Sequence, residues 1–198
     1  MELADFIRNF PLLLPEAGRA WLIPSVLNDF LRLMIASLNN NYVVNSGVAV
    51  HREAVIEDGV VLKAPVIVSK GCFIGAHAYL RGGVYLDEGV RIGPGCEIKS
   101  SFIGAHSSLA HFNFVGDSLV GSHVNVEAGA IIANHHNDRS DKRIFLKHQG
   151  TIIDTELEKF GAIVGDRAKI GANAVLAPGT LLLPDTIVGR LELVDQSK

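Results

Sequence analysis

Residues 78–99 read AYLRGGVYLDEGVRIGPGCEIK, and an aliphatic side chain stands there at every sixth position. The same spacing extends on both sides of this stretch, and a small or β-branched residue stands two positions before each aliphatic one. The unbroken series comprises Val50, Ile56, Leu62, Val68, Ile74, Leu80, Leu86, Ile92 and Ile98. It continues at Ile103, Leu109, Val115, Val120, Val126 and Ile132 with two five-residue steps, and after a polar segment at Val164, Ile170, Leu176, Leu182, Val188 and Val194. This regularity predicts one structural unit repeated along the chain.

A period of six fits neither an α-helix, with about 3.6 residues per turn, nor a simple alternating strand. It is typical of a parallel β-helix, in which each hexad makes one flat face and a turn, and three hexads close a triangular coil. We therefore predict an all-β fold of about seven coils with the aliphatic side chains inside. Coils of this type resemble the left-handed β-helix family, an exception to the right-handed crossover rule. Cys72 and Cys96 occupy the small inward position, which predicts packing rather than a reactive thiol.

The chain divides into a helical cap or linker, residues 1–44, and the β-helix, residues 45–198, with an inserted polar loop at 134–160. The apolar positions of residues 25–38 follow one stripe of an amphipathic helix, for which Ser25 is a plausible N-cap. A shorter helix is expected at residues 2–9. Because repeat arrays need capped ends, we expect the helical segment to cover an open end of the β-helix.

The bulk composition argues against several classes of partner. The net charge is −3 and no long run carries one sign, so neither nucleic acid nor a membrane surface is indicated. The apolar residues 21–38 include a proline and two charged residues, which argues against membrane insertion. With no basic leader region and two cysteines, a cytoplasmic protein without disulfides is expected.

An 18-residue coil stacks Lys63, Arg81 and Lys99 in one cationic column, which either binds an anionic ligand or is merely solvated. His111 lies two hexads beyond Lys99, hence at a different edge, so a neighbouring subunit would have to bring the two together. Outward positions carry four aromatic residues, an apolar surface that needs a cover: Phe73, Tyr79, Tyr85 and Phe114. These two observations predict a homotrimer.

Residues 104–137 are the part of the chain richest in His and Asn. Four motifs precede or lie in this stretch: Leu80-Arg81, Ile98-Lys99, His111-Phe112-Asn113-Phe114-Val115-Gly116-Asp117, and Gly121 through Val124-Asn125 to Ala128-Gly129 and Asn134. Together they resemble the acetyltransferase domain of the bacterial bifunctional glucosamine-1-phosphate N-acetyltransferase/uridylyltransferases, and of archaeal sugar-phosphate nucleotidyltransferases. The resemblance covers about residues 45–142 and needs no gap between Arg81 and Asn134.

The resemblance implies an acyl-CoA-dependent transferase, using acetyl-CoA or another acyl-CoA and no metal, that acts on an amino sugar or sugar phosphate. His111 would be the general base, which takes the proton that prevents an amine from attacking a thioester. The implied substrate contacts are Arg81, Lys99, Phe114, Asn125, Asn134 and Lys142, and the implied coenzyme A contacts are Ala128, His135 and Ala172. Backbone N–H groups near Gly129 are candidates for stabilising the oxyanion.

Phe114 and His135 stand where the family has tyrosines, which predicts an acceptor other than glucosamine 1-phosphate, such as a nucleotide-linked amino sugar. No Gly-rich nucleotide loop precedes residue 45, so we expect no uridylyl transfer from this chain.

Three alternatives remain open. The repeats also resemble the lipid A type UDP-sugar acyltransferases that use acyl-carrier protein, and a non-catalytic scaffold trimer would show the same pattern. The spacing of His106 and His111 suggests zinc, as in γ-class carbonic anhydrases. A third ligand would then fall near residue 71, where Gly71 stands, which argues against this interpretation.

Overall fold

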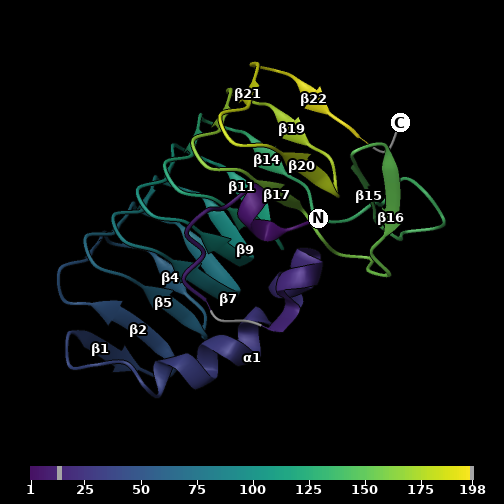
Figure 1. The fold of residues 1–198 in the computed structure, drawn as a ribbon. Coiled ribbons are helices and arrows are strands. Elements are labelled where there is room, and N and C mark those ends of the chain that lie inside the picture. Colours follow the sequence, from purple (N-terminus) through teal and green to yellow (C-terminus); the bar gives the residue numbers. More distant parts are fainter. Residues whose placement is uncertain (13–14, 197–198) are drawn as a thin grey trace.

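The computed structural model describes residues 1–12 and 15–196, and most of them form a parallel β-solenoid of about eight turns (Figure 1). The predicted β-helix is confirmed. Strands pair in parallel with those one coil away, at an offset of 18 residues between Val66 and Val84 and of 17 between Ile98 and Val115. Each coil passes over three faces, which we number in chain order.

Face 1 consists of β2 (Val48–His51), β5 (Val66–Val68), the second halves of β7 (Tyr79–Leu86) and β9 (Glu97–Ile103), β12 (Leu119–Val120), β17 (Ala162–Val164) and β20 (Thr180–Leu182). Face 2 consists of β3 (Val55–Ile56), β6 (Phe73–Ile74), β8 (Arg91–Ile92), β10 (Ser108–Leu109), β13 (Asn125–Val126), β18 (Lys169–Ile170) and β21 (Ile187–Val188). Face 3 consists of β4 (Val61–Leu62), the first halves of β7 and β9, β11 (Phe114–Gly116), β14 (Ile131–Ile132), β19 (Val175–Leu176) and β22 (Leu193–Val194). The three corners are named after the faces they join.

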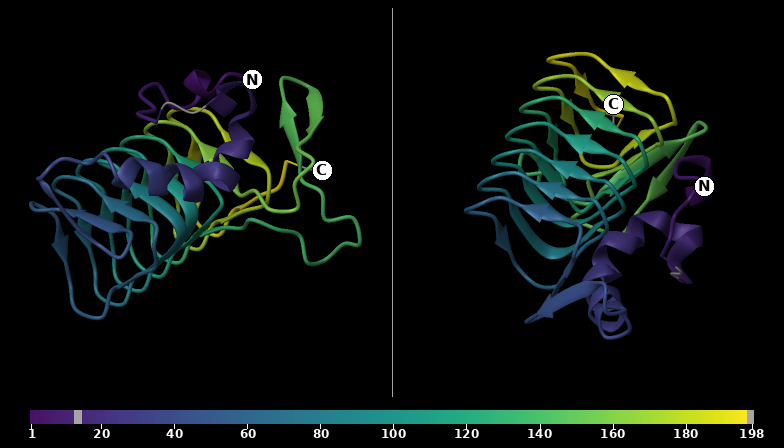
Figure 2. Two further views of the ribbon diagram at one scale, coloured as in Figure 1. Left: turned by 90° about the horizontal axis from the view of Figure 1, so that it is seen from below. Right: turned by 90° about the vertical axis from the view of Figure 1, so that its left-hand side faces the viewer.

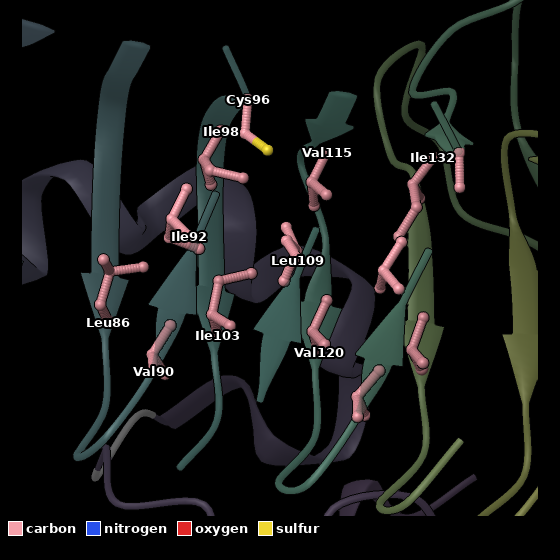
Figure 3. Close-up of a cluster of buried hydrophobic side chains, with 14 of the residues drawn as sticks. Leu86, Val90, Ile92, Cys96, Ile98, Ile103, Leu109, Val115, Val120 and Ile132 are labelled. Atoms are coloured by element: carbon pink, nitrogen blue, oxygen red, sulfur yellow. The ribbon is translucent and has the colours of Figure 1, made fainter. Parts of the chain in front are cut away.

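The aliphatic hexad positions point into the solenoid and stack coil upon coil (Figure 3). From Val68 to Leu182 these side chains are almost completely buried. Cys72 and Cys96 are buried in the same core, and burial raises the pKa of the Cys72 thiol to about 11. Both cysteines are therefore packing residues, as predicted.

The two five-residue steps of the repeat occur at the 3–1 corner. In β7 six residues lead from Leu80 to Leu86, whereas in β9 five lead from Ile98 to Ile103, and the register shifts between them at Gly82 and Gly83. Gly83 has φ +96°, and a Cβ there would lie 2.9 Å from the Cα of Asn28 in the N-terminal helix. The coil therefore shortens at the point where that helix approaches the sheet.

The N-terminal segment lies along the side of the solenoid, not over its open end as predicted (Figure 2). It contains η1 (Leu3–Asp5), η2 (Pro15–Leu22) and α1 (Ile23–Ile35), and α1 packs on β5, β7 and β9. The end formed by β2–β4 remains open. As a result, Ile56, whose side chain points inward, exposes 36% of its surface. Ser25 lies in the first turn of α1 instead of at the N-cap, which is Leu22. Pro24 suits this turn because its first N–H groups have no helical acceptor.

The N-terminal segment packs on face 1 because the outward side chains of this face are apolar and are buried by the contact. These side chains are Ala49, Ile67, Tyr85, Phe102, Leu119, Ile163 and Leu181. Tyr85 is buried there and stacks on Phe102, with 5.5 Å between ring centroids. It is therefore not part of a free apolar surface, contrary to the sequence-based prediction.

The insertion expected to be a loop contains a hairpin of β15 (Phe145–His148) and β16 (Thr151–Asp154). Its two-residue turn, Gln149-Gly150, has positive φ at both positions, as hairpin turns of this length require. Ile144, Leu146 and Phe160 pack into the cluster on face 1, so the insertion completes the cover that the N-terminal segment begins. β1 (Tyr42–Asn45) pairs antiparallel with β2 through a similar turn, Ser46-Gly47.

Candidate active site

His111 lies at the 2–3 corner, in a stack of turns that contains one turn from each coil. The N–H of Gly129 donates to the carbonyl of His111 at 2.8 Å, and the N–H of Asn173 donates to that of Ala128 at 3.0 Å. These bonds align His111, Ala128 and Ala172 as equivalent positions of successive coils. The predicted base and two of the three predicted coenzyme contacts therefore share one corner of the chain.

The exposed side chain of His111 borders a small pocket of about 230 Å³ on face 2. The other residues that line it are Phe73, Arg91, Gly93, Pro94, Ser108, Leu109 and Ala110. None of the predicted substrate residues is among them. Arg91, which the sequence analysis did not single out, supplies the positive charge beside His111.

A larger pocket of about 430 Å³ lies on the same face, toward the C-terminal coils, and predicted Asn125 lines it. Lys169 and Arg190 make this pocket cationic. The Glu127 carboxylate accepts from the Ala172 N–H at 2.8 Å and from the Arg190 guanidinium at 2.8 and 2.9 Å. The bond from Arg190, followed by that from Ala172, lowers the pKa of Glu127 to about 2.

The Gly129 N–H is not available for an oxyanion, because it is bonded to His111. Ala128 is different. Ala76 and Ala172 occupy the equivalent position in other coils, and the N–H of each donates at 2.8 Å to a glutamate side chain of the preceding coil. For Ala128 the corresponding residue of the preceding coil is Ala110, which has no carboxylate. Within the described chain the Ala128 N–H has no hydrogen-bond acceptor.

Asn113 holds the turn that carries Ala128. Its side chain is buried in a row that is otherwise mostly apolar, and its amide donates to the carbonyls of Glu127 at 2.7 Å and Ala130 at 3.3 Å. A polar residue at an inward position of the hexad is the sequence signal that would have identified it.

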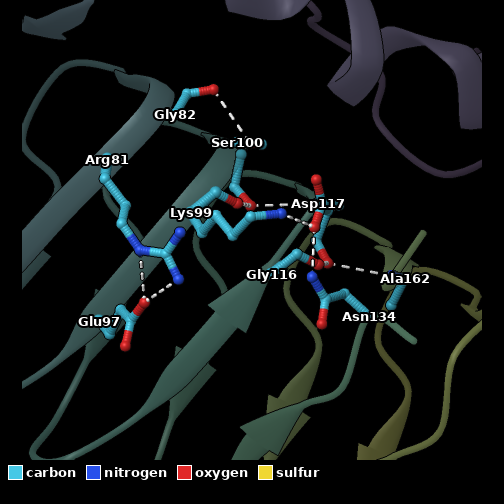
Figure 4. Close-up of polar contacts among 11 residues, drawn as sticks. Arg81, Gly82, Glu97, Lys99, Ser100, Gly116, Asp117, Asn134 and Ala162 are labelled. Atoms are coloured by element: carbon cyan, nitrogen blue, oxygen red, sulfur yellow. Dashed lines mark hydrogen bonds and ion pairs between the residues drawn. The ribbon is translucent and has the colours of Figure 1, made fainter. Parts of the chain in front are cut away.

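The cationic column lies at the 3–1 corner, where Arg81 and Lys99 are register partners (Figure 4). The Arg81 guanidinium lies 2.7 Å from the Glu97 carboxylate, and the Lys99 ammonium 2.5 Å from that of Asp117. The Asn134 amide donates to the same oxygen of Asp117 (Figure 4). The chain itself thus supplies anions to two members of the stacked column, whereas the Lys63 ammonium lies 5.5 Å from the centroid of the Tyr79 ring.

The remaining predicted residues are separate from both corners. Phe114 lies half-buried on face 3, between its register partners Glu97 and Ile131. Lys142 and His135 are exposed residues of the insertion. The structure therefore distributes the predicted site residues over the 2–3 corner, the 3–1 corner, the insertion and the strands of faces 2 and 3. His106 lies at the 1–2 corner and stacks on His123, with 5.2 Å between centroids, so it is not beside His111.

In the described part of the chain, no helix has the length and apolar character needed to cross a membrane.

The sequence is similar to proteins that are named as bifunctional. It is 34% identical over 187 residues to the "Bifunctional protein GlmU" of Methanococcus vannielii, covering 91% of this chain and 44% of that protein. It is 32% identical over 169 residues to the "Bifunctional sugar-1-phosphate nucleotidylyltransferase/acetyltransferase" of Sulfurisphaera tokodaii, covering 83% and 42%. The chain thus spans less than half the length of these relatives. The resemblance inferred from the motifs is confirmed.

Among solved structures, the chain resembles a GDP-perosamine N-acetyl transferase mutant from Caulobacter crescentus, in complex with CoA and GDP-perosamine. The TM-score is 0.42 at 18% identity, over 72% of this chain and 53% of that one. A family model described as the GMPPB C-terminal domain matches residues 38–145. The matched range begins just after α1 and ends at the first residue of β15 in the insertion. Because this match covers more than half of the chain, the protein belongs to the GMPPB C-terminal domain family.

Proposed function

We propose that this protein transfers an acyl group, in the simplest case acetyl, from acyl-CoA to the amine of an amino sugar. The observation that carries the proposal lies at the 2–3 corner, where the exposed imidazole of His111 is one coil away from the Ala128 N–H, which has no acceptor among the described residues. The relative from Sulfurisphaera tokodaii, whose name includes an acetyltransferase, supports the same reaction.

In this mechanism, a neutral His111 imidazole accepts a proton from the substrate amine as the nitrogen attacks the thioester carbon. General base catalysis of this kind contributes typically about 10²–10⁴-fold in rate. The tetrahedral intermediate then collapses, the carbon–sulfur bond breaks, and the proton passes from the imidazole to the leaving thiolate. The products are an amide and free coenzyme A.

The Ala128 N–H is the candidate oxyanion donor in place of Gly129. Removing one such donor from an acyl-transfer site costs about 10²–10³-fold in kcat in a well-studied hydrolase. Asn113 supports this role, because its two bonds to the flanking carbonyls hold the turn rigid. A donor already in position requires no reorganisation when charge develops.

The acyl donor would follow the 2–3 corner, from His111 past Ala128 and Ala172 to the pocket with Lys169 and Arg190. Lys169 offers the phosphates of coenzyme A a cation there, and Arg190 offers a second one that is already paired with Glu127. Glu127 supports this arrangement, since its bonds to Ala172 and Arg190 hold the guanidinium against the turn column.

The acceptor would contact Arg81, Lys99, Asn134 and the exposed insertion residues of a neighbouring subunit. We infer a homotrimer because face 3 separates these residues from His111 within one chain. Face 3 also leaves side chains such as Tyr79, Phe114 and Ile131 only partly buried. A stable, active monomer in sedimentation would contradict the trimer.

The test is a thiol-release screen. Acetyl-CoA, longer acyl-CoA species and acyl-carrier protein are offered with amino sugars, amino-sugar phosphates and UDP-amino sugars. We expect transfer from acyl-CoA, and His111→Ala should lower kcat by about 10²-fold or more with little effect on acyl-CoA binding.

His77→Asn is the matched control, since His77 is another exposed histidine of the same corner and its φ of +60° suits asparagine. It should leave turnover unchanged. Transfer from acyl-carrier protein alone would instead indicate a lipid A type enzyme, and no transfer from any donor would favour a scaffold. Unchanged turnover in His111→Ala would refute the role of His111.

A further inference from the structure

Arg91 is the only charged residue, apart from the titratable His111, among those that line the small pocket on face 2. It belongs to β8, and its register partner in β10 is Ser108, which also lines the pocket. The remaining lining is apolar or glycine, without a carboxylate. Because no carboxylate of the lining neutralises it, the Arg91 guanidinium can attract an anionic ligand into this pocket.

The guanidinium of Arg91 is held without being neutralised. Its central carbon lies 5.0 Å from the centroid of the Phe73 ring, a cation–π contact that orients the group and leaves its N–H donors free. Arg91 makes no ion pair with any residue of the described chain. The flat ring of Phe73 therefore orients the Arg91 guanidinium, and the N–H donors of the guanidinium are available to a ligand.

The other arginines around the candidate site differ in this respect. Arg81 is paired with Glu97 at 2.7 Å, and Arg190 with Glu127 at 2.8 Å. Lys99 is likewise paired, with Asp117 at 2.5 Å. An incoming anion must compete with a carboxylate at each of these three positions, but not at Arg91. The hydroxyl of Ser108 offers a further donor on the adjacent strand.

We propose that the Arg91 pocket binds a phosphate group of one of the two reactants, beside His111 and within the same subunit. This inference rests on the proposed acyl transfer. The phosphate belongs either to the acceptor, as a sugar phosphate or nucleotide-linked sugar, or to the acyl donor. In both cases Arg91 fixes a reactant by a charge-assisted, forked contact that a lysine would not reproduce.

The experiment compares Arg91→Gln and Phe73→Leu with wild type, using reactants with and without phosphate. Acetyl-CoA is paired with S-acetylpantetheine, which lacks phosphate, and a phosphorylated amino sugar with the free amino sugar. Lys70→Gln is the control, because it removes the same charge from an exposed lysine at the 1–2 corner that pairs only loosely with Glu53.

We expect Arg91→Gln to raise KM about 10- to 100-fold for the reactant whose phosphate it binds, as loss of hydrogen bonds to a charged group implies, with kcat little changed. The phosphate-free counterpart should be unaffected. Phe73→Leu should produce a smaller increase for the same reactant, because it removes only the surface that orients the guanidinium. Whichever reactant responds identifies the source of the phosphate.

Equal effects on reactants with and without phosphate would assign Arg91 a structural role and overturn the proposal, as would no effect at all. If wild type transfers no acyl group, the proposed function fails independently, and direct titration with inorganic phosphate decides the site. Binding by wild type and Lys70→Gln, but not by Arg91→Gln, would then support the pocket. Equal binding by all three would overturn it. Circular dichroism checks that each variant is folded.

Discussion

The ammonium group of Lys99 lies 2.5 Å from Oδ2 of Asp117, and the Asn134 amide donates to that same oxygen. Both members of this pair are largely shielded from water, with 18% and 11% of their side-chain surfaces exposed. Arg81, at the same corner, and its partner Glu97 on face 3 expose 37% and 35%. One corner therefore carries a shielded and an exposed version of the same interaction.

Asp117→Asn should lower the free energy of unfolding by about 1–3 kcal/mol, because it leaves a partly buried ammonium group without its carboxylate. Asparagine tolerates the φ of +45° at this position, so backbone strain does not contribute. Glu97→Gln is the control and should cost at most about 1 kcal/mol. Urea unfolding measures both variants, and equal losses would show that shielding has no influence here.

Phe112→Asn should raise the free energy of unfolding by about 1 kcal/mol, because a bulky side chain in the left-handed region costs roughly that much. Phe112 has φ +53° and is 72% exposed, so little burial is lost with the ring. Leu191→Asn tests the same column, with φ +60° and 78% exposure, and should give a similar gain.

The ring of Phe112 folds over Gly95 of the preceding coil, where an added Cβ would lie 2.6 Å from it. A loss of stability in Phe112→Asn, alongside a gain in Leu191→Asn, would mean that this contact outweighs the backbone strain.

The link between Glu127 and Arg190 should survive in acid. The pKa of Glu127 falls from an ordinary value near 4.5 to about 2, chiefly through the bond from Arg190. The carboxylate's contribution to stability is therefore complete above about 4.5 and is lost as the pH falls through about 2. Side-chain carboxyl NMR should give a midpoint near 2 for Glu127.

Arg190→Gln should move that midpoint up toward the ordinary value. Asp141, which Arg143 holds at a pKa of about 2 in the insertion, serves as the internal reference and should not move. An unchanged Glu127 midpoint in Arg190→Gln would show that Arg190 is not the main cause of the lowered pKa.

Phe114→Tyr should raise kcat/KM for glucosamine 1-phosphate, if the proposed transfer holds. A tyrosine hydroxyl bonded to a charged phosphate contributes about 1.5–3 kcal/mol, which corresponds to roughly 10- to 100-fold. The wild type should prefer a UDP-amino sugar. Efficient wild-type use of glucosamine 1-phosphate, unimproved by the tyrosine, would show that the acceptor inference from Phe114 is wrong.

The repeat made the coil predictable because both the hexad period and the offset of about 18 residues are properties of the chain order. The alignment of Arg81 with Lys99 followed from that offset, as did the separation of His111 from them. The hairpin of the insertion was not predicted, because its polar flanking residues resemble a loop and its apolar residues stand in adjacent pairs instead of alternating with polar ones.

The hexad repeat alone predicts the solenoid, its inward side chains and the separation of His111 from Arg81 and Lys99, because a repeat of constant length converts residue number into position. The folded chain is needed to show which groups are already paired: Glu97 with Arg81, Asp117 with Lys99, and Glu127 with Arg190. The folded chain also places the N-terminal segment and the insertion over face 1, and leaves Arg91 beside His111 without an ion pair to any described residue. These outcomes depend on side-chain conformations and on contacts between segments far apart in the chain, which no periodicity encodes.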